Sequence, residues 1–232
     1  MTRKLYWEQP YEREFSAKVL SLEGSKVILD QTLFYPRGGG VACDTGSING
    51  ITVTETTKDG EVIIHNLTSA PGFGVGDMVK GRIDWERRYL LMRMHTAGHL
   101  LSSIFFSKAN CRITGNQVEV EKSRMDFNLE SFDRSTIEGY VEEANRLIKA
   151  DTPVKTYFLP RDEALKLPEM VKLAEASPPG EAQLRIVEIE GIDRQADGGQ
   201  HVARLLEIGQ IQLVKLENKG KSNRRLYYTL IS

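Results

Sequence analysis

The chain has few cysteines, few histidines and no long apolar run, and the first and last of these shortages each exclude a class of protein. Its 232 residues include only two cysteines, Cys43 and Cys111, which form neither a disulfide ladder nor a metal knuckle. No stretch approaches the roughly 18 apolar residues that a membrane-spanning helix needs. Residues 1–7 lead into charged sequence without the apolar core of a signal peptide. We therefore expect a cytoplasmic protein that does not engage a membrane.

An excess of charge of one sign is also missing. Lysine and arginine number 31, aspartate and glutamate number 32, and the formal net charge is -1. This balance argues against a strongly cationic, non-specific nucleic-acid binder, because such binding depends on neutralising phosphates. A local basic patch remains near the C-terminus, where a single acid, Glu217, accompanies Lys215, Lys219, Lys221, Arg224 and Arg225. Taken alone, this patch is either a solvated loop or a set of phosphate contacts.

Residues 1–85 show short strand patterns separated by turns. Apolar or alternating runs occur at 15–22, 26–30, 51–54, 61–65 and 78–83. Turn dipeptides such as Asp59-Gly60 and Pro71-Gly72 separate them. Strands of this length and spacing predict a small barrel or sandwich.

The pattern becomes helical after residue 85. Between Trp85 and Lys108, apolar residues recur at steps of three and four, which predicts one face of a long helix. A second helical pattern follows Asp133, and strand patterns occur at 117–120, 154–159, 184–189 and 208–216. We expect an α+β fold with two domains, 1–85 and 86–232, the second being a sheet packed by helices.

Two of the four histidines lie within the first helical pattern. His95 and His99 are four residues apart, so their side chains share one helix face and both could reach one ion at about 2.0–2.1 Å. Thr96 stands where a zinc protease motif requires glutamate, which argues against that class. Gly98 costs about 1 kcal/mol relative to alanine in a helix, so we expect another group to pack closely there. Alone, the pair is either a metal site or an ordinary core or surface pair.

A second cluster follows about a hundred residues later. Gly198 and Gly199 let the backbone turn sharply, which brings Asp197 and His201 to one side of a loop. These residues could join His95 and His99, with Asp197 as a ligand or as an outer anchor, and leave a position for water. A divalent metal lowers the pKa of such a water toward 7, which suits hydrolysis. The fourth histidine, His65, has no partner in the sequence and is interpreted as structural.

These motifs resemble a known family. The segments His95-Thr96-Ala97-Gly98-His99 and Asp197-Gly198-Gly199-Gln200-His201-Val202 resemble the H-x-x-x-H and C-G-G-T-H-V motifs of the alanyl-tRNA synthetase editing domain and of the free-standing AlaX editing proteins. The segment Phe34-Tyr35-Pro36-Arg37-Gly38-Gly39-Gly40 with Asp44-Thr45-Gly46 resembles the glycine-rich motif of that family, and Ser123-Arg124-Met125-Asp126-Phe127 its R-x-D-F strand. The resemblance implies the medium-sized AlaX type, with an N-terminal β-barrel and an editing domain that binds one Zn²⁺ per chain. Asp197 replaces the usual cysteine ligand, and Gln200 replaces the usual threonine.

The resemblance also implies an activity. It implies ATP-independent hydrolysis of tRNA(Ala) mischarged with serine, and also with glycine. A site that accepts serine and spares the smaller alanine cannot work by size, so it must read the hydroxyl. Thr114 is the expected reader, and Gln117 would orient the ester or water. The loop of Gly38, Gly39 and Gly40 is either a turn or a cover for the substrate, while Lys219, Lys221, Arg224 and Arg225 become phosphate contacts.

Two other functions stay open at this point. The chain could be a non-catalytic tRNA-binding module whose metal is structural, which would require a closed shell of four ligands. It could also be a metallohydrolase of unrelated esters, for which the basic patch would have no use. The sequence leaves open whether the protein is a monomer or a dimer.

Overall fold

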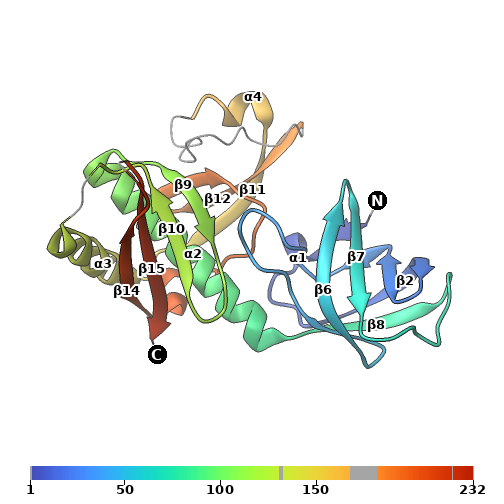
Figure 1. Cartoon of the computed structure of the whole chain (residues 1–232). Coiled ribbons are helices and arrows are strands. Elements are labelled where there is room, and N and C mark those ends of the chain that lie inside the picture. Colours follow the sequence, from blue (N-terminus) through green and yellow to red (C-terminus); the bar gives the residue numbers. More distant parts are fainter. Residues whose placement is uncertain (1, 131–132, 168–181, 221, 232) are drawn as a thin grey trace. The chain divides into compact units, whose positions relative to one another are not determined.

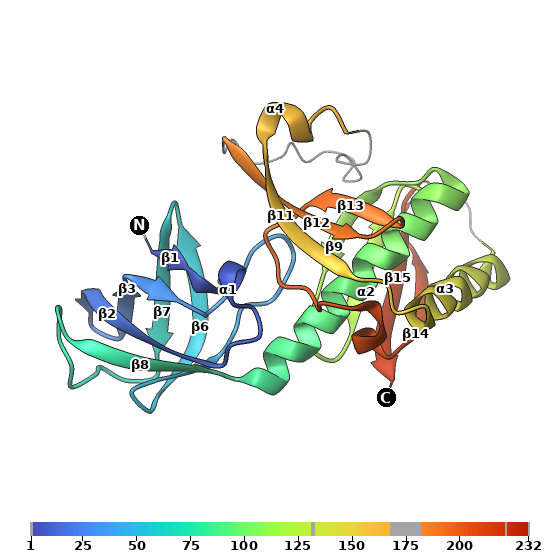
Figure 2. The same ribbon diagram turned by 180° about the vertical axis from the view of Figure 1, so that it is seen from behind.

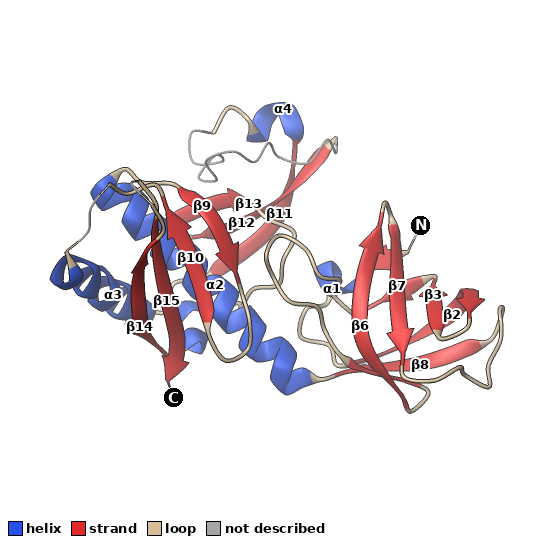
Figure 3. Cartoon of the chain, in the orientation of Figure 1, coloured by secondary structure: helices blue, strands red, loops and turns tan. Residues whose placement is uncertain are grey.

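The computed structural model describes residues 2–130, 133–167, 182–220 and 222–231 (Figure 1). The chain divides into two compact units, Met1–Leu91 and Met92–Ser232. Both contain strands, and the longer helices belong largely to the second unit (Figure 3). The mixed helix and strand content confirms the predicted α+β class. No helix in the described ranges is both long and apolar enough to cross a bilayer.

The first unit is built around a ring of six paired strands. The ring order is β2-β3-β7-β6-β5-β8, and pairing of β8 with β2 from Glu14↔Arg82 to Lys18↔Met78 closes the barrel. The ring strands are β2 (Glu14–Glu23), β3 (Lys26–Leu29), β5 (Gly46–Ile48), β6 (Ile51–Asp59), β7 (Val62–Leu67) and β8 (Met78–Ile83). Outside the ring lie β1 (Arg3–Lys4), α1 (Leu5–Glu8) and β4 (Gln31–Thr32).

Alternation of side chains fills the barrel. Strand β8 buries Val79, Gly81 and Ile83 and exposes the residues between them. Gly81 has no room for a side chain, because a Cβ there would lie 2.2 Å from the ring of Phe15. The buried face of each strand therefore contributes to one apolar core, as its period of two residues requires.

Helix α2 covers Trp85–Ala109, which confirms the helix predicted from Trp85 to Lys108. The division between the two units falls within this helix, after Leu91. Near its start, Arg88 and Asp44 form a buried ion pair, with Arg88 Nε 2.9 Å from Asp44 Oδ1. Arg88 also donates to the main-chain oxygen of Leu33. This pair fixes the first turn of α2 to the segment that follows the glycine-rich turn.

The second unit contains two sheets and further helices. One sheet has the order β14-β15-β10-β9 and the other β11-β12-β13. Its strands are β9 (Ile113–Gln117), β10 (Ser123–Phe127), β11 (Val154–Pro160), β12 (Gln183–Ile189), β13 (Asp193–Ala196), β14 (Gln210–Asn218) and β15 (Arg224–Ile231). Its helices besides α2 are α3 (Arg134–Lys149), α4 (Arg161–Ala164) and the 3-10 helix η2 (Leu205–Ile208).

Helices α2 and α3 lie against the same face of the four-stranded sheet, as the two opposite views show (Figures 1 and 2). Asp133 caps α3 by accepting a hydrogen bond from Thr136 N at 3.1 Å. Gly98 of α2 meets Tyr228 of β15, where a Cβ would lie 2.9 Å from the Tyr228 hydroxyl. This confirms the expectation that another group packs closely on Gly98.

Candidate metal centre

Helix α2 presents His95 and His99 toward strand β13 and the loop that follows it. The two rings meet edge to face, with centroids 4.9 Å apart. The loop after β13 brings His201 beside these two histidines. The His201 ring stacks on the His95 ring, with centroids 4.2 Å apart. The sequence spacing therefore does bring the two histidine clusters together.

The loop can approach this closely because of one glycine. A Cβ on Gly199 would lie 2.4 Å from Cε1 of His95, so any side chain would displace that ring. Gly199 N also donates to Asp197 Oδ1 at 2.5 Å. Arg185 of β12 donates through Nη1 to the carbonyl oxygens of Asp197 and Gly199, both at 2.9 Å. The loop is thus held by a hydrogen bond within itself and by two hydrogen bonds from Arg185.

The histidine Nε2 atoms converge on one carboxylate. His95 Nε2 and His99 Nε2 lie 3.6 and 3.8 Å from Asp197 Oδ2, and His201 Nε2 lies 3.3 Å from Asp197 Oδ1. One donor atom from each of the four residues can be chosen so that all lie within 4.8 Å of one another. Each Nε2 faces another potential ligand.

The Nδ1 atoms have separate partners in the surrounding structure. His95 Nδ1 lies 3.3 Å from the main-chain oxygen of Gln200, and His99 Nδ1 lies 3.2 Å from Asp193 Oδ2. His201 Nδ1 lies 3.1 Å from Thr96 Oγ1. Partners at Nδ1 orient each ring and leave Nε2 for the centre, which is how metal-binding histidines are commonly fixed.

The charges in the cluster depend on one another. Burial lowers the pKa of His95 to about 4 and lowers the pKa of His201 well below its ordinary value. Burial also opposes charge on His99, but Asp193 and Asp197 outweigh it and raise the pKa of His99 to about 9. Burial opposes charge on Asp197 too, yet the histidines hold its pKa well below the usual range. One imidazolium is thus balanced by carboxylates.

The donor set fits a divalent ion. Three imidazole nitrogens and one carboxylate oxygen form a set that Zn²⁺ accepts, and three of the four residues are buried. The set does not identify the metal, since imidazole and carboxylate also suit other divalent ions. A buried cluster of His95, His99, Asp197 and His201 could therefore hold one ion.

Thr114 and Gln117, the expected reader and orienting residue, both lie on β9. The Thr114 side chain is exposed, and its hydroxyl donates to Asn223 Oδ1 at 2.7 Å. Gln117 Oε1 accepts from Arg124 Nε at 3.0 Å. Their described partners thus lie just before β15 and on β10 rather than in the histidine cluster, and their roles stay predictions.

The glycine-rich segment of the first unit forms a tight turn. Gly38 and Val41 exchange main-chain hydrogen bonds of 3.3 and 2.9 Å, with Gly39 and Gly40 at the corner. The corner residues have φ of 58° and 80°, which is the region that glycine adopts without strain. The turn alone accounts for these two glycines, and substrate binding by Gly38, Gly39 and Gly40 stays a prediction.

The basic patch near the C-terminus is partly neutralised by acids and carbonyls. Lys219 lies 2.9 Å from Glu217, and Arg225 forms a two-pronged ion pair with Asp126 at 2.6 and 2.9 Å. Arg224 donates to the carbonyl oxygens of Gly220 and Asn223 at 2.7 and 3.0 Å. Lys221 lies outside the described residues. Phosphate contacts by these side chains stay predictions.

Two polar residues beside the centre, Asp193 and Gln200, were not among the predicted site residues. Asp193 is buried and accepts from both His99 and Gln195, the latter at 2.9 Å. Gln200 is also buried, and within the described part of the chain neither atom of its side-chain amide has a hydrogen-bond partner. Both stand in the polar run 193–201, and this concentration of polar residues is the one signal that could have pointed to them.

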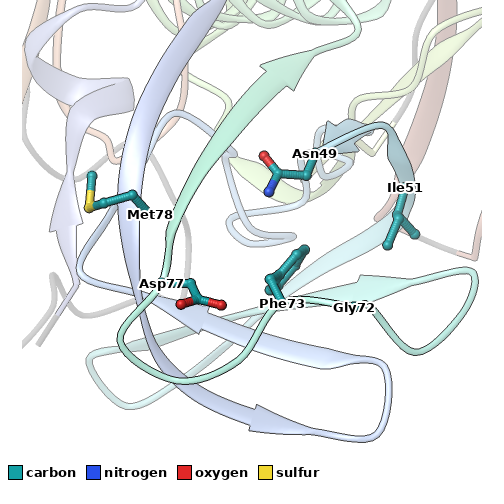
Figure 4. Close-up of a pocket in the computed structure, with 6 residues that line it drawn as sticks. All are labelled: Asn49, Ile51, Gly72, Phe73, Asp77 and Met78. Atoms are coloured by element: carbon teal, nitrogen blue, oxygen red, sulfur yellow. The ribbon is translucent and has the colours of Figure 1, made fainter.

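An open pocket on the barrel has a different character. It is lined by Asn49, Ile51, Gly72, Phe73, Asp77 and Met78 (Figure 4). Its one carboxylate, Asp77, accepts from Gly74 N at 2.8 Å and so belongs to the turn before β8. This pocket brings together no cluster of titratable groups, and the histidine cluster remains the better candidate for chemistry.

Comparison with known proteins shows which class of protein shares the modules of this chain. A family model described as tRNA synthetases class II (A) matches residues 6–87. A second, described as threonyl and alanyl tRNA synthetase second additional domain, matches residues 184–227. The second match includes Asp193, Asp197 and His201. The chain thus shares modules with aminoacyl-tRNA synthetases.

Relatives of the same length define the family. The alanyl-tRNA editing protein AlaX-M of Saccharolobus solfataricus is 46% identical over 99% of both chains, and that of Methanosarcina acetivorans is 43% identical over 100% of both. The alanine-tRNA ligase of Methanococcus maripaludis is 36% identical over 98% of this chain, which spans 26% of that ligase. The chain belongs to the AlaX-M family of alanyl-tRNA editing proteins.

Proposed function

We propose that this chain is an editing hydrolase that cleaves the ester of tRNA(Ala) mischarged with serine, and also with glycine. One Zn²⁺ per chain would be held by His95, His99, His201 and Asp197. The observation that carries the proposal is the convergence of three Nε2 atoms on the Asp197 carboxylate, at 3.3 to 3.8 Å. Family membership supports the substrate class, since the full-length relatives are named alanyl-tRNA editing proteins.

The residues around the centre keep the ligands in place during the reaction. A bound divalent ion supplies Lewis acidity, which polarises a carbonyl and makes water a better nucleophile near neutral pH. Asp193 and the Gln200 carbonyl hold the rings of His99 and His95 by their Nδ1 atoms. Arg185 fixes the main chain on both sides of Gly198. These hydrogen bonds keep the ligand atoms in a fixed geometry when the substrate binds.

Selection of serine over alanine requires a polar group that pairs with the seryl hydroxyl. We assign this role to Thr114. Its hydroxyl proton points to Asn223 Oδ1 at 2.7 Å, which leaves the oxygen of Thr114 able to accept a hydrogen bond from a substrate hydroxyl. Gln117, paired with Arg124, would help to orient the ester or water.

The rest of the tRNA would be held by positive side chains. Lys219, Lys221, Arg224 and Arg225 would contact phosphates near the acceptor end, and the turn of Gly38, Gly39 and Gly40 would contact the substrate through its backbone. Phosphate contacts position the nucleic acid and make its affinity fall with salt.

The test is a deacylation assay. Purified protein is incubated with seryl-, glycyl- and alanyl-tRNA(Ala), with and without a chelator. We expect rapid loss of the seryl ester, slower loss of the glycyl ester because glycine lacks the hydroxyl, an intact alanyl ester, and inhibition by the chelator that added Zn²⁺ reverses. Seryl-tRNA(Ala) that survives with metal bound would show the proposal to be wrong.

One observation favours a second function, a tRNA-binding module with a structural metal. Asp197 faces all three histidines, so it could close a four-ligand shell that excludes water. In that case the protein would bind tRNA(Ala) and metal tightly while every ester in the assay stayed intact.

A further inference from the structure

The three Nδ1 atoms of the cluster differ in the kind of partner they have. The carbonyl of Gln200 and the carboxylate of Asp193 can only accept, so His95 and His99 must each carry a proton on Nδ1. The partner of His201 is the hydroxyl of Thr96, which can either donate or accept. Which nitrogen of His201 carries its proton therefore depends on the direction of one hydroxyl.

The surroundings of Thr96 favour one direction. Thr96 is fully buried, and its Oγ1 lies 2.9 Å from Met92 O, 3.2 Å from Val202 N and 3.1 Å from His201 Nδ1. When the hydroxyl proton points to Met92 O, the oxygen accepts from both Val202 N–H and His201 Nδ1–H, and all three contacts are hydrogen bonds. Serine and threonine in helices often donate in this way to the carbonyl four residues back.

The opposite direction exchanges one hydrogen bond for a longer one. If Thr96 donated to His201 Nδ1, its oxygen would face Met92 O at 2.9 Å with no proton between them. The proton of His201 would then sit on Nε2 and donate to Asp197 Oδ1 at 3.3 Å. That contact is longer than the 2.9 Å bond to Met92 O, and the same carboxylate oxygen already accepts from Gly199 N. A protonated Nε2 has no lone pair to offer an ion.

We propose that Thr96 is a positioning residue that sets the tautomer of His201. It holds the proton on Nδ1 and leaves the lone pair of Nε2 directed into the centre. Thr96 acts through His201 and is not itself a ligand, and the inference rests on the metal centre of the proposed function. It assigns a role to the threonine that lies between the two helix histidines.

The experiment compares Thr96→Val, which keeps the shape and removes the hydroxyl, with Thr96→Ser, which keeps the hydroxyl. Ser107→Ala is the matched control, because Ser107 is on the same helix and its hydroxyl donates to Ile104 O at 3.0 Å, away from the centre. Zn²⁺ affinity is measured by competition with a chelator. We expect Thr96→Val to bind about 10- to 100-fold more weakly, and the other two variants to stay within about threefold of the native protein.

A second readout reports the tautomer directly. Nitrogen NMR of the metal-free native protein should show His201 protonated on Nδ1, and Thr96→Ser should show the same. Thr96→Val also removes the acceptor of Val202 N–H, so a purely structural role would lower its stability and leave Zn²⁺ affinity unchanged. That result, or an Nε2-protonated His201 in the native protein, would overturn the inference.

The two proposals fail separately. If the native protein binds no Zn²⁺, the proposed metal centre is wrong, and the NMR tautomer alone decides the role of Thr96. If the native protein binds Zn²⁺ and cleaves seryl-tRNA(Ala) while Thr96→Val binds equally well, only the role of Thr96 is wrong.

Discussion

His65 of the barrel and the three histidines of the second unit are all buried, yet their ring nitrogens meet different surroundings. His65 Nδ1 lies 3.0 Å from Val27 O and its Nε2 lies 2.8 Å from Thr32 Oγ1, so both nitrogens are satisfied within the barrel. In the second unit each Nδ1 has such a partner, but each Nε2 faces the shared carboxylate of Asp197. Burial alone therefore does not mark a functional histidine. The distinguishing feature is a second ring nitrogen that faces other potential metal ligands.

The pKa values of His65 and His99 also differ in direction. Burial lowers the pKa of His65 to about 4, against a weaker opposing effect of the Val27 carbonyl, so this ring is neutral. In the cluster, Asp193 and Asp197 reverse the effect of burial on His99 and raise its pKa to about 9. The surroundings of His65 exclude charge, while the cluster places carboxylates beside its histidines.

The largest effect should come from removing one ring of the cluster. His99→Ala deletes a ligand and leaves Asp193 without its imidazole partner, so we expect cleavage of seryl-tRNA(Ala) to fall by at least about 10³-fold, the scale typical of losing an essential catalytic group. The matched control is His65→Gln, which should cleave at the native rate if it folds. A fully active His99→Ala variant would show that this histidine of α2 takes no part in the active site.

The next effect concerns the stability of the barrel at acid pH. The unfolded chain takes up a proton on His65 near the ordinary pKa of 6.5, while the folded barrel resists it down to about 4. The unfolded state therefore binds more protons, and the unfolding free energy falls as pH falls from 6.5 toward 4. At pH 5 this loss is about 2 kcal/mol for His65 alone.

Denaturant unfolding at pH 7 and pH 5 measures this loss. The difference between the two pH values should be about 2 kcal/mol larger in the native protein than in His65→Gln, because the variant lacks the titrating ring. Other histidines contribute equally to both proteins and cancel. Equal pH dependence in both would mean that His65 takes up its proton as readily in the fold as in the unfolded chain, and would break the contrast with the cluster.

A smaller effect on substrate preference is expected at Thr114. Its hydroxyl donates to Asn223 Oδ1, and its oxygen can still accept a hydrogen bond. Thr114→Val should lower the preference for seryl- over alanyl-tRNA(Ala) by about tenfold or more, because the site loses its partner for the hydroxyl. Thr229→Val, whose hydroxyl donates to Glu121 O at 2.8 Å, serves as the control. An unchanged ratio of rates would assign the reading of the hydroxyl to another residue.

The smallest effect is expected at Lys219, which already has Glu217 at 2.9 Å. Lys219→Ala should weaken tRNA(Ala) binding by a few-fold and reduce the slope of log affinity against log salt by about one. Lys155→Ala, which removes an exposed lysine paired with Glu190, should leave the slope unchanged. Identical slopes in both variants would place Lys219 outside the tRNA interface.

The sequence predicted those features that depend on local spacing. The period of apolar residues located α2, and the four-residue step placed His95 and His99 on one face. The glycine within the helix indicated close packing, which Tyr228 supplies. The two glycines after Asp197 indicated a sharp turn, and one of them allows the approach to His95.

Features that depend on contacts between distant segments could not be predicted. Nothing near Thr96 in the sequence indicates that its hydroxyl meets His201, and nothing near Arg225 indicates the ion pair with Asp126. A local error also occurred at the predicted strand 117–120. Strand β9 ends at Gln117, and Ser123 Oγ binds the main chain of Glu119 in the connection to β10.

The most direct test of the proposed metal centre is a count of the bound metal. Equilibrium dialysis against Zn²⁺, followed by elemental analysis, gives the number of ions per chain in the native protein, His65→Gln and His99→Ala. The proposed metal centre predicts one ion in the native protein and in His65→Gln, and loss of that ion in His99→Ala. A native protein that binds no ion, or a His99→Ala variant that binds one as tightly as the native protein, would contradict it.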